Sequence, residues 1–162
     1  MWLSDRRMFL GSMLALTGCG FAPVYAPGGA ANLLQGRVTV DEPVDRDSYL
    51  LVQQLETRLG RGDAPVYGLS LGLEVQQERM AINAANITTR FNVIGKSTYA
   101  LRDLRDGKVI TSGTVNSFTG YSATGTTTAT QAAKRDAHKR LMTILADQIV
   151  TRLIATADEL PA

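Results

Sequence analysis

Residues 66–75 alternate large apolar side chains with small or polar ones, and this pattern restricts the possible folds more than any other feature. The apolar members of the alternation are Tyr67, Leu69, Leu71, Leu73 and Val75. Because successive side chains of a β-strand point to opposite faces, a period of two predicts a strand with one buried and one solvent-facing side. The pattern allows the strand to continue to Met80. A sheet with one buried face needs a second layer to cover that face.

Residues 88–101 predict a second long strand. Its apolar face carries Phe91, Val93, Tyr99 and Leu101. A hairpin turn follows at Asp106 and Gly107, a pair that accepts positive φ. The Val-, Ile- and Thr-rich residues 108–121 then form the returning strand, and a shorter strand ends the segment 33–40.

The facing of the returning strand depends on the length of the hairpin turn. A two-residue turn would place Ile110 and Phe118 on the same face as the apolar side chains of residues 88–101. One extra turn residue would instead place Val109, Val115 and Tyr121 there. The sequence leaves both registers open.

Two segments have the spacing of amphipathic helices. The first has its apolar positions at Leu51, Val52, Leu55 and Leu59, with Asp47 or Ser48 as the expected N-cap and Gly60 at its end. The second covers residues 132–154, about 35 Å of helix at 1.5 Å per residue. Its expected inward stripe is Ala133, Ala137, Leu141, Ile144, Leu145, Ile149 and Leu153. A Gly/Ser/Thr loop over 120–130 precedes this helix, and residues 155–162 are expected to fray.

The elements follow the order β-α-β-β-β-α. This order predicts an α+β fold, a two-layer sandwich with a mostly antiparallel or mixed four-stranded sheet and two helices packed on one face. We expect residues 33–162 to form this single domain. Residues 19–32, rich in Pro, Gly and Ala, are expected to form an extended tether.

The first 19 residues have the features of a bacterial export signal that ends at a lipidated cysteine. Arg6 and Arg7 precede a short apolar stretch, too short to cross a bilayer as a helix. Residues 16–19, Leu-Thr-Gly-Cys, resemble a lipobox, which implies that residues 1–18 are removed and that Cys19 becomes the acylated first residue. Gly20 then indicates the outer membrane as the destination, and either twin-arginine or general secretion is possible as the export route.

The composition excludes several classes of protein. One Cys and one His do not permit a disulfide framework or the usual four-ligand Cys/His zinc site. A net charge of +2 argues against a nucleic-acid coat. His138 is interpreted as part of a solvated basic helix face, and no carboxylates are paired by spacing. We therefore expect no catalytic residues, no metal and no cofactor.

Two groups of basic residues are candidates for binding phosphates. Arg90 and Lys96 lie on the polar face of the strand predicted over 88–101, and Arg and Lys suit phosphate groups. The second group is a basic patch on the long helix, formed by Lys134, Arg135, Lys139 and Arg140. The alternative interpretation of the helix group is a solubilising face. For the strand group it is a charged strand face that discourages sheet-to-sheet aggregation.

The start of the mature chain, Cys-Gly-Phe-Ala-Pro-Val-Tyr at residues 19–25, resembles that of the LptE family of lipopolysaccharide-assembly lipoproteins. The order of elements and the Ala-rich last helix are also similar. The resemblance implies a lipid-anchored protein on the periplasmic side of the outer membrane. It would plug the LptD β-barrel translocon and bind lipopolysaccharide, with Arg90 and Lys96 as candidate contacts. The alternative is a free-standing structural envelope lipoprotein, or an auxiliary subunit of an inner-membrane lipid exporter.

Overall fold

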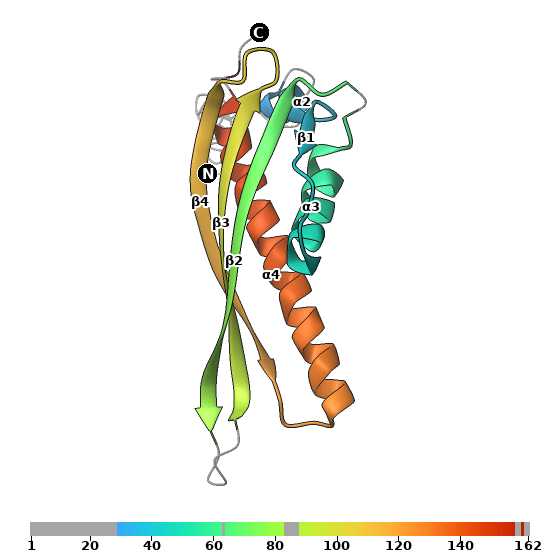
Figure 1. The fold of residues 1–162 in the computed structure, drawn as a ribbon, viewed down its shortest axis with the longest axis vertical. Coiled ribbons are helices and arrows are strands. Elements are labelled where there is room, and N and C mark those ends of the chain that lie inside the picture. Colours follow the sequence, from blue (N-terminus) through green and yellow to red (C-terminus); the bar gives the residue numbers. More distant parts are fainter. Residues whose placement is uncertain (1–28, 63, 83–87, 158–159, 161–162) are drawn as a thin grey trace, which may run out of the picture.

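The computed structural model describes residues 29–62, 64–82, 88–157 and 160. Its elements are α2 (Ala30–Leu34), β1 (Val38–Val40), α3 (Arg46–Leu59), β2 (Tyr67–Ile82), β3 (Thr88–Asp103), β4 (Val109–Ser122) and α4 (Thr127–Ala155). The sheet has the order β1-β2-β3-β4, in which β1 pairs parallel with β2 and the other pairs are antiparallel. Helices α3 and α4 lie on the same side of it (Figure 1). The predicted α+β sandwich with a mixed sheet is confirmed.

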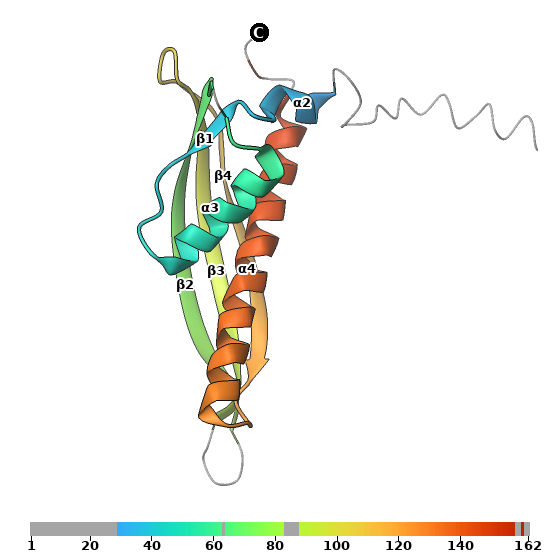
Figure 2. The same cartoon turned by 90° about the vertical axis from the view of Figure 1, so that its right-hand side faces the viewer.

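The alternation in β2 produces the predicted burial. Tyr67 and Leu69 are fully buried, whereas Glu74 on the other face is exposed. Burial weakens along the strand, and every residue from 76 to 82 is exposed. The reason is that α3 covers only the part of the sheet near β1. Of the described helices, only α4 continues toward the end where β2 finishes and β3 begins (Figures 1 and 2).

The β3–β4 hairpin turns at Gly107, whose φ of 75° is the positive value predicted there. Beyond the turn, Val115 and Tyr121 face the helices, in agreement with the longer-turn register. Phe118 points to the open face and is 65% exposed. The longer-turn register also predicted that Val109 lies on the buried face, and this prediction was wrong. A bulge shifts the pairing between Leu101 and Arg102, so Val109 pairs with Arg102 and is 56% exposed.

Helix α3 begins earlier than the sequence suggested. Its N-cap is Asp45, which forms a capping box with Ser48, so neither Asp47 nor Ser48 occupies the cap position. The signal for this arrangement is the three-residue spacing of two residues that can cap each other. The predicted end is confirmed, because Gly60 follows the helix with a φ of 76°.

Helix α4 is longer than predicted, because Thr126 caps it and the preceding loop shrinks to residues 123–126. Most of the expected inward stripe is buried, but Ile144 is 37% exposed. Three residues outside that stripe are also buried: Met142, Ala146 and Val150. The buried surface of α4 is wider than the predicted apolar stripe because α4 packs against α3 as well as against the sheet.

Two short segments at the ends of the domain also differ from the prediction. Residues 30–32, expected in the tether, belong to α2, which buries Leu34 completely. Ala157, expected to fray, is 1% exposed, and Leu160 packs against the core. In the part of the chain that the structure describes, no helix combines the length and apolar character needed to cross a membrane.

Candidate functional site

Arg90 and Lys96 lie on the face of β3 that none of the described helices covers. Arg90 pairs across the sheet with Ser122, and Lys96 lies between Glu74 and Asn116. Both side chains are exposed, and neither forms an ion pair with another described residue. Six residues of extended strand separate them by about 20 Å. One small group therefore cannot contact both, although a large amphiphile can.

Arg90 also lines a surface cavity of about 420 Å³ near the end of the sheet. The carbonyl of Gly120, in the same cavity wall, accepts a hydrogen bond of 3.2 Å from Arg140 Nη2. Arg140 additionally pairs with Asp136 at 3.0 Å. This end of the molecule therefore carries Arg90 on the sheet and Arg140 on α4.

The predicted basic patch on α4 is divided between two sides of the helix. The Arg140 side chain contacts the Gly120 carbonyl in β4. Lys134 and Arg135 instead line a different cavity, between α4 and the start of α3. Lys139 is exposed and lines neither of these cavities. The structure brings Lys134 and Arg135 together but does not unite all four basic residues.

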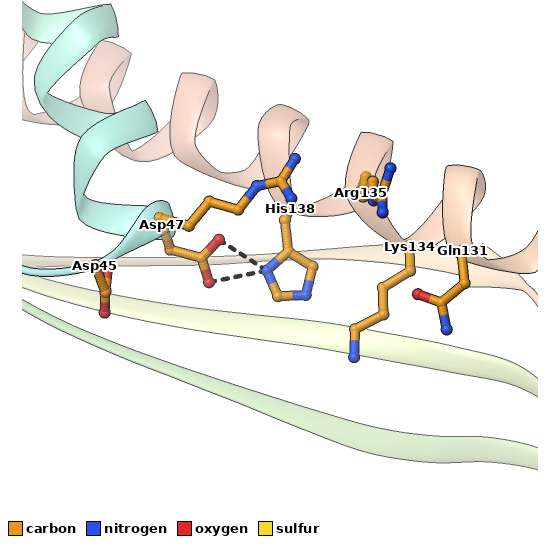
Figure 3. Close-up of a pocket in the computed structure, with 7 residues that line it drawn as sticks. Asp45, Asp47, Gln131, Lys134, Arg135 and His138 are labelled. Carbon is orange, nitrogen blue, oxygen red and sulfur yellow. Dashed lines mark hydrogen bonds and ion pairs between the residues drawn. The ribbon is translucent and has the colours of Figure 1, made fainter.

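His138 is not part of a solvated face, contrary to the sequence interpretation. Its side chain is 19% exposed, and its Nδ1 lies 2.9 and 3.0 Å from the two carboxylate oxygens of Asp47 (Figure 3). An ionised carboxylate only accepts, so Nδ1 donates and carries a proton. The contact joins α4 to the first turn of α3 across 91 positions of sequence, and for that reason no local pattern reveals it.

The cavity beside this pair has a volume of about 420 Å³. Its walls are Asp45, Arg46 and Asp47 from α3 and Gln131, Lys134, Arg135 and His138 from α4. Figure 3 shows the imidazole with Asp47 on one side and Lys134 on the other. Asp45 serves as the helix cap, and its hydrogen bond from the Ser48 backbone N–H is the largest cause that lowers its pKa.

An Asp–His pair is also two-thirds of a hydrolytic triad, so the third position matters. His138 Nε2 is buried, and it has no hydrogen-bond partner among the described residues. No hydroxyl within the described residues is therefore placed for activation by this imidazole. The described residues likewise contain no group of three or more side chains that could hold a metal ion. The arrangement suits binding of an anion better than covalent chemistry.

A third cavity, of about 430 Å³, lies on the open face of the sheet. It is lined by Asn92, Ile94, Asn116, Ser117 and Phe118. Ile94 and Phe118 are cross-strand neighbours. They form a small apolar area in an otherwise polar face.

The fold and these surfaces define a class: a two-layer α+β domain with one open sheet face and cationic surface cavities. The sequence pattern of the family LptE, lipopolysaccharide-assembly, matches residues 35–153. This is more than half of the chain, and the protein belongs to that family. The match begins after residues 19–25, so it is independent of the motif on which the resemblance was first based.

Solved structures with the same fold come from several bacteria. A Caulobacter crescentus protein described as a lipoprotein is 23% identical, with a TM-score of 0.66, and the match covers 80% of this chain and 98% of that one. Rare lipoprotein B from Shewanella oneidensis is 14% identical, with a TM-score of 0.56 and coverage of 74% and 93%. A minor lipoprotein from Acinetobacter baumannii is 17% identical, with a TM-score of 0.52 and coverage of 74% and 89%. No curated protein matches the sequence.

Proposed function

We propose that the protein is an outer-membrane lipoprotein that plugs an LptD-like β-barrel and binds lipopolysaccharide during its assembly into the outer leaflet. The observation that carries the proposal is the match to the lipopolysaccharide-assembly family across residues 35–153. That range includes all four strands, the whole of α3, and α4 as far as Leu153. The proposal needs no catalytic residue.

The shape and surface of the domain support a plug. Helix α4 and strands β2 to β4 run along one long axis, which gives an elongated body (Figures 1 and 2). The uncovered sheet face is mostly polar, with Glu74, Lys96 and Asn116 side by side across three strands. Large outer-membrane barrels have polar interiors, so a polar body of this form is suited to such a lumen.

Cys19 lies outside the described residues, and its acylation is part of the proposal. One acyl chain gives only marginal membrane binding, whereas two or more anchor a protein stably. Mass spectrometry of the N-terminal peptide of the mature protein tests this point. We expect an acylated Cys19 as the first residue, and an unmodified peptide that begins at Met1 would contradict the anchor.

Association with the barrel is tested by affinity purification of the full chain from detergent-solubilised outer membranes. We expect a β-barrel of about 16 or more strands to co-purify. The free-standing and inner-membrane alternatives predict no barrel, and the second predicts inner-membrane transport components instead. A Cys19→Ser chain in the same experiment shows whether the association depends on the anchor.

The proposed lipopolysaccharide contacts on the sheet are Arg90 and Lys96, whose exposed cations can pair with lipid phosphates. We expect Arg90→Ala or Lys96→Ala to lower the affinity for lipopolysaccharide. The matched control is Arg102→Ala, because Arg102 lies on the same face of β3 but pairs with Asp41 at 3.6 Å. An equal effect of all three variants would remove the assignment of Arg90 and Lys96 without affecting the plug.

A further inference from the structure

The cavity between α3 and α4 has an excess of positive charge once the ion pairs of its walls are counted. Its two carboxylates are already engaged. Asp45 accepts hydrogen bonds of 2.7 Å from the backbone N–H and from the hydroxyl of Ser48. Asp47 accepts from His138. Because the donors to Asp45 are neutral, that carboxylate keeps its charge. Two carboxylates and three cations, Arg46, Lys134 and Arg135, therefore leave the walls with a net charge of +1 when His138 is counted as neutral.

Three basic side chains in the same walls are without an ion-pair partner among the described residues. They are Arg46 from α3 and Lys134 and Arg135 from α4. Elsewhere in the described chain, several surface cations do have such partners, for example Arg58 with Asp147 at 2.9 Å. Cations from two different helices that converge on one cavity without forming an ion pair with its carboxylates favour an external anion.

The imidazole of His138 lies in the wall of the same cavity, next to these charges. Nδ1 is committed to Asp47, which leaves Nε2 as the free position of the ring. Nε2 is buried and has no partner in the described part of the chain. With the proton on Nδ1, Nε2 of the neutral ring is an acceptor, and its burial keeps it from contact with an anion in the cavity. The anion is therefore held by the three cations.

We propose that this cavity binds a phosphate monoester. A monoester carries close to two negative charges and three terminal acceptor oxygens, which can be shared between Arg46, Lys134 and Arg135. A carboxylate has one charge and two oxygens, and would leave more of these donors unpaired. The volume of about 420 Å³ falls in the range of small-molecule pockets, so it admits the sugar or glycerol that bears the phosphate.

This inference deepens the proposed function. It rests on that function only for the identity of the molecule that carries the phosphate. A lipid headgroup and a free phosphate ester present the same chemistry to the cavity. Binding to the cavity can be measured on the isolated full chain without a barrel. Failure of the phosphate site with retained barrel co-purification would therefore overturn this inference alone.

The single histidine of the chain provides the assay. The full acylated chain in detergent micelles is titrated with inorganic phosphate at constant ionic strength, and the imidazole Cε1–Hε1 NMR signal of His138 is followed. A second series adds phosphatidic acid, a monoester, to the micelles, with phosphatidylglycerol, a diester, as its counterpart. We expect a saturable shift of the His138 signal with the monoester and a much weaker one with the diester.

Variants connect the shift to the cavity. In Lys134→Gln/Arg135→Gln we expect the apparent Kd to rise at least about tenfold, which corresponds to the loss of one charge-assisted hydrogen bond. The control Arg61→Gln/Lys108→Gln removes the same charge from side chains that are 82% and 83% exposed and lie outside the cavity. Its Kd should stay within about twofold. Arg46→Gln, in the opposite wall, gives an independent second variant.

A shift with inorganic phosphate supports a site for free phosphate groups, and a shift only with phosphatidic acid supports a lipid headgroup. The inference is overturned if neither probe shifts His138, if the diester equals the monoester, or if the cavity variants bind as the control does.

Discussion

Gly95 sets how closely α4 lies on the sheet, and its replacement gives a measurable test of the packing. It is buried in β3 and faces α4. A Cβ added there would lie 3.0 Å from Leu141 Cδ2 and 3.0 Å from Leu145 Cδ1. Both leucines are completely buried. Ordinary carbon contacts are about 3.5–4.0 Å, so an alanine must push the helix outward or rotate packed leucines.

The magnitude follows from two opposing effects. Overpacking of a well-packed core costs about 1–3 kcal/mol. Gly→Ala also reduces the entropy of the unfolded chain, which offsets about 0.4–1 kcal/mol. We therefore expect Gly95→Ala to lower the free energy of unfolding by about 1–2 kcal/mol. For a domain of this size, each kcal/mol lowers Tm by about 2–4 °C.

Urea unfolding followed by circular dichroism measures the effect. Gly120→Ala is the matched control, because Gly120 is also in the sheet but an added Cβ meets the end of the Asn92 side chain at 3.2 Å and the Phe91 carbonyl oxygen at 3.4 Å, and no core side chain. It should change stability by no more than about 0.5 kcal/mol. In a Leu145→Ala background, the cost of Gly95→Ala should shrink by about 0.5 kcal/mol or more. An equal cost in both backgrounds would refute the contact as the cause.

Three further predictions concern stability. Asp45→Ala removes the cap of α3 and should lower the free energy of unfolding by about 0.5–2 kcal/mol in the same assay; an unchanged value would contradict the capping role. Hydrogen bonds from the Arg105 side chain, which have the largest effect, and from the Arg105 backbone N–H lower the pKa of Asp103 below 3.8. Ionised Asp103 therefore adds to the free energy of unfolding above pH 3.8, and this stabilisation is lost as the pH falls through the lower pKa of the folded protein. Asp103→Asn should therefore flatten the decline of Tm under acid, and parallel curves for the two proteins would count against this linkage. Leu55→Ala should cost about 2–5 kcal/mol because Leu55 is completely buried, whereas Val44→Ala, at a side chain 94% exposed, should change little.

The main elements were readable from sequence because their signals are local. The alternation from Tyr67 to Val75 reports which side of a strand is buried, and Gly107 and Gly60 mark a turn and a helix end. The register of β4 was not readable, since the bulge at Leu101 and Arg102 depends on how the hairpin closes. Helix α2 was missed because residues 30–34 have only five positions, too few for a periodic pattern.

Only part of the candidate cavity could be predicted from the sequence. Lys134 and Arg135 were identified as basic, but the role of His138 depends on Asp47, which is 91 positions away. Nothing near His138 in the sequence indicates that contact. The division of the basic patch could not be predicted either. The hydrogen bond from the Arg140 side chain to the Gly120 carbonyl depends on where α4 packs against β4.

The proposed plug is tested most directly by photo-crosslinking from two opposite faces of the protein in intact cells. Phe118 projects from the open sheet face and is 65% exposed, and Tyr49 projects from α3 and is 57% exposed. A photoreactive residue at either position should crosslink to the same large barrel protein, because a lumen surrounds its plug. Crosslinks to the barrel from only one of the two faces, or from neither, would contradict the account.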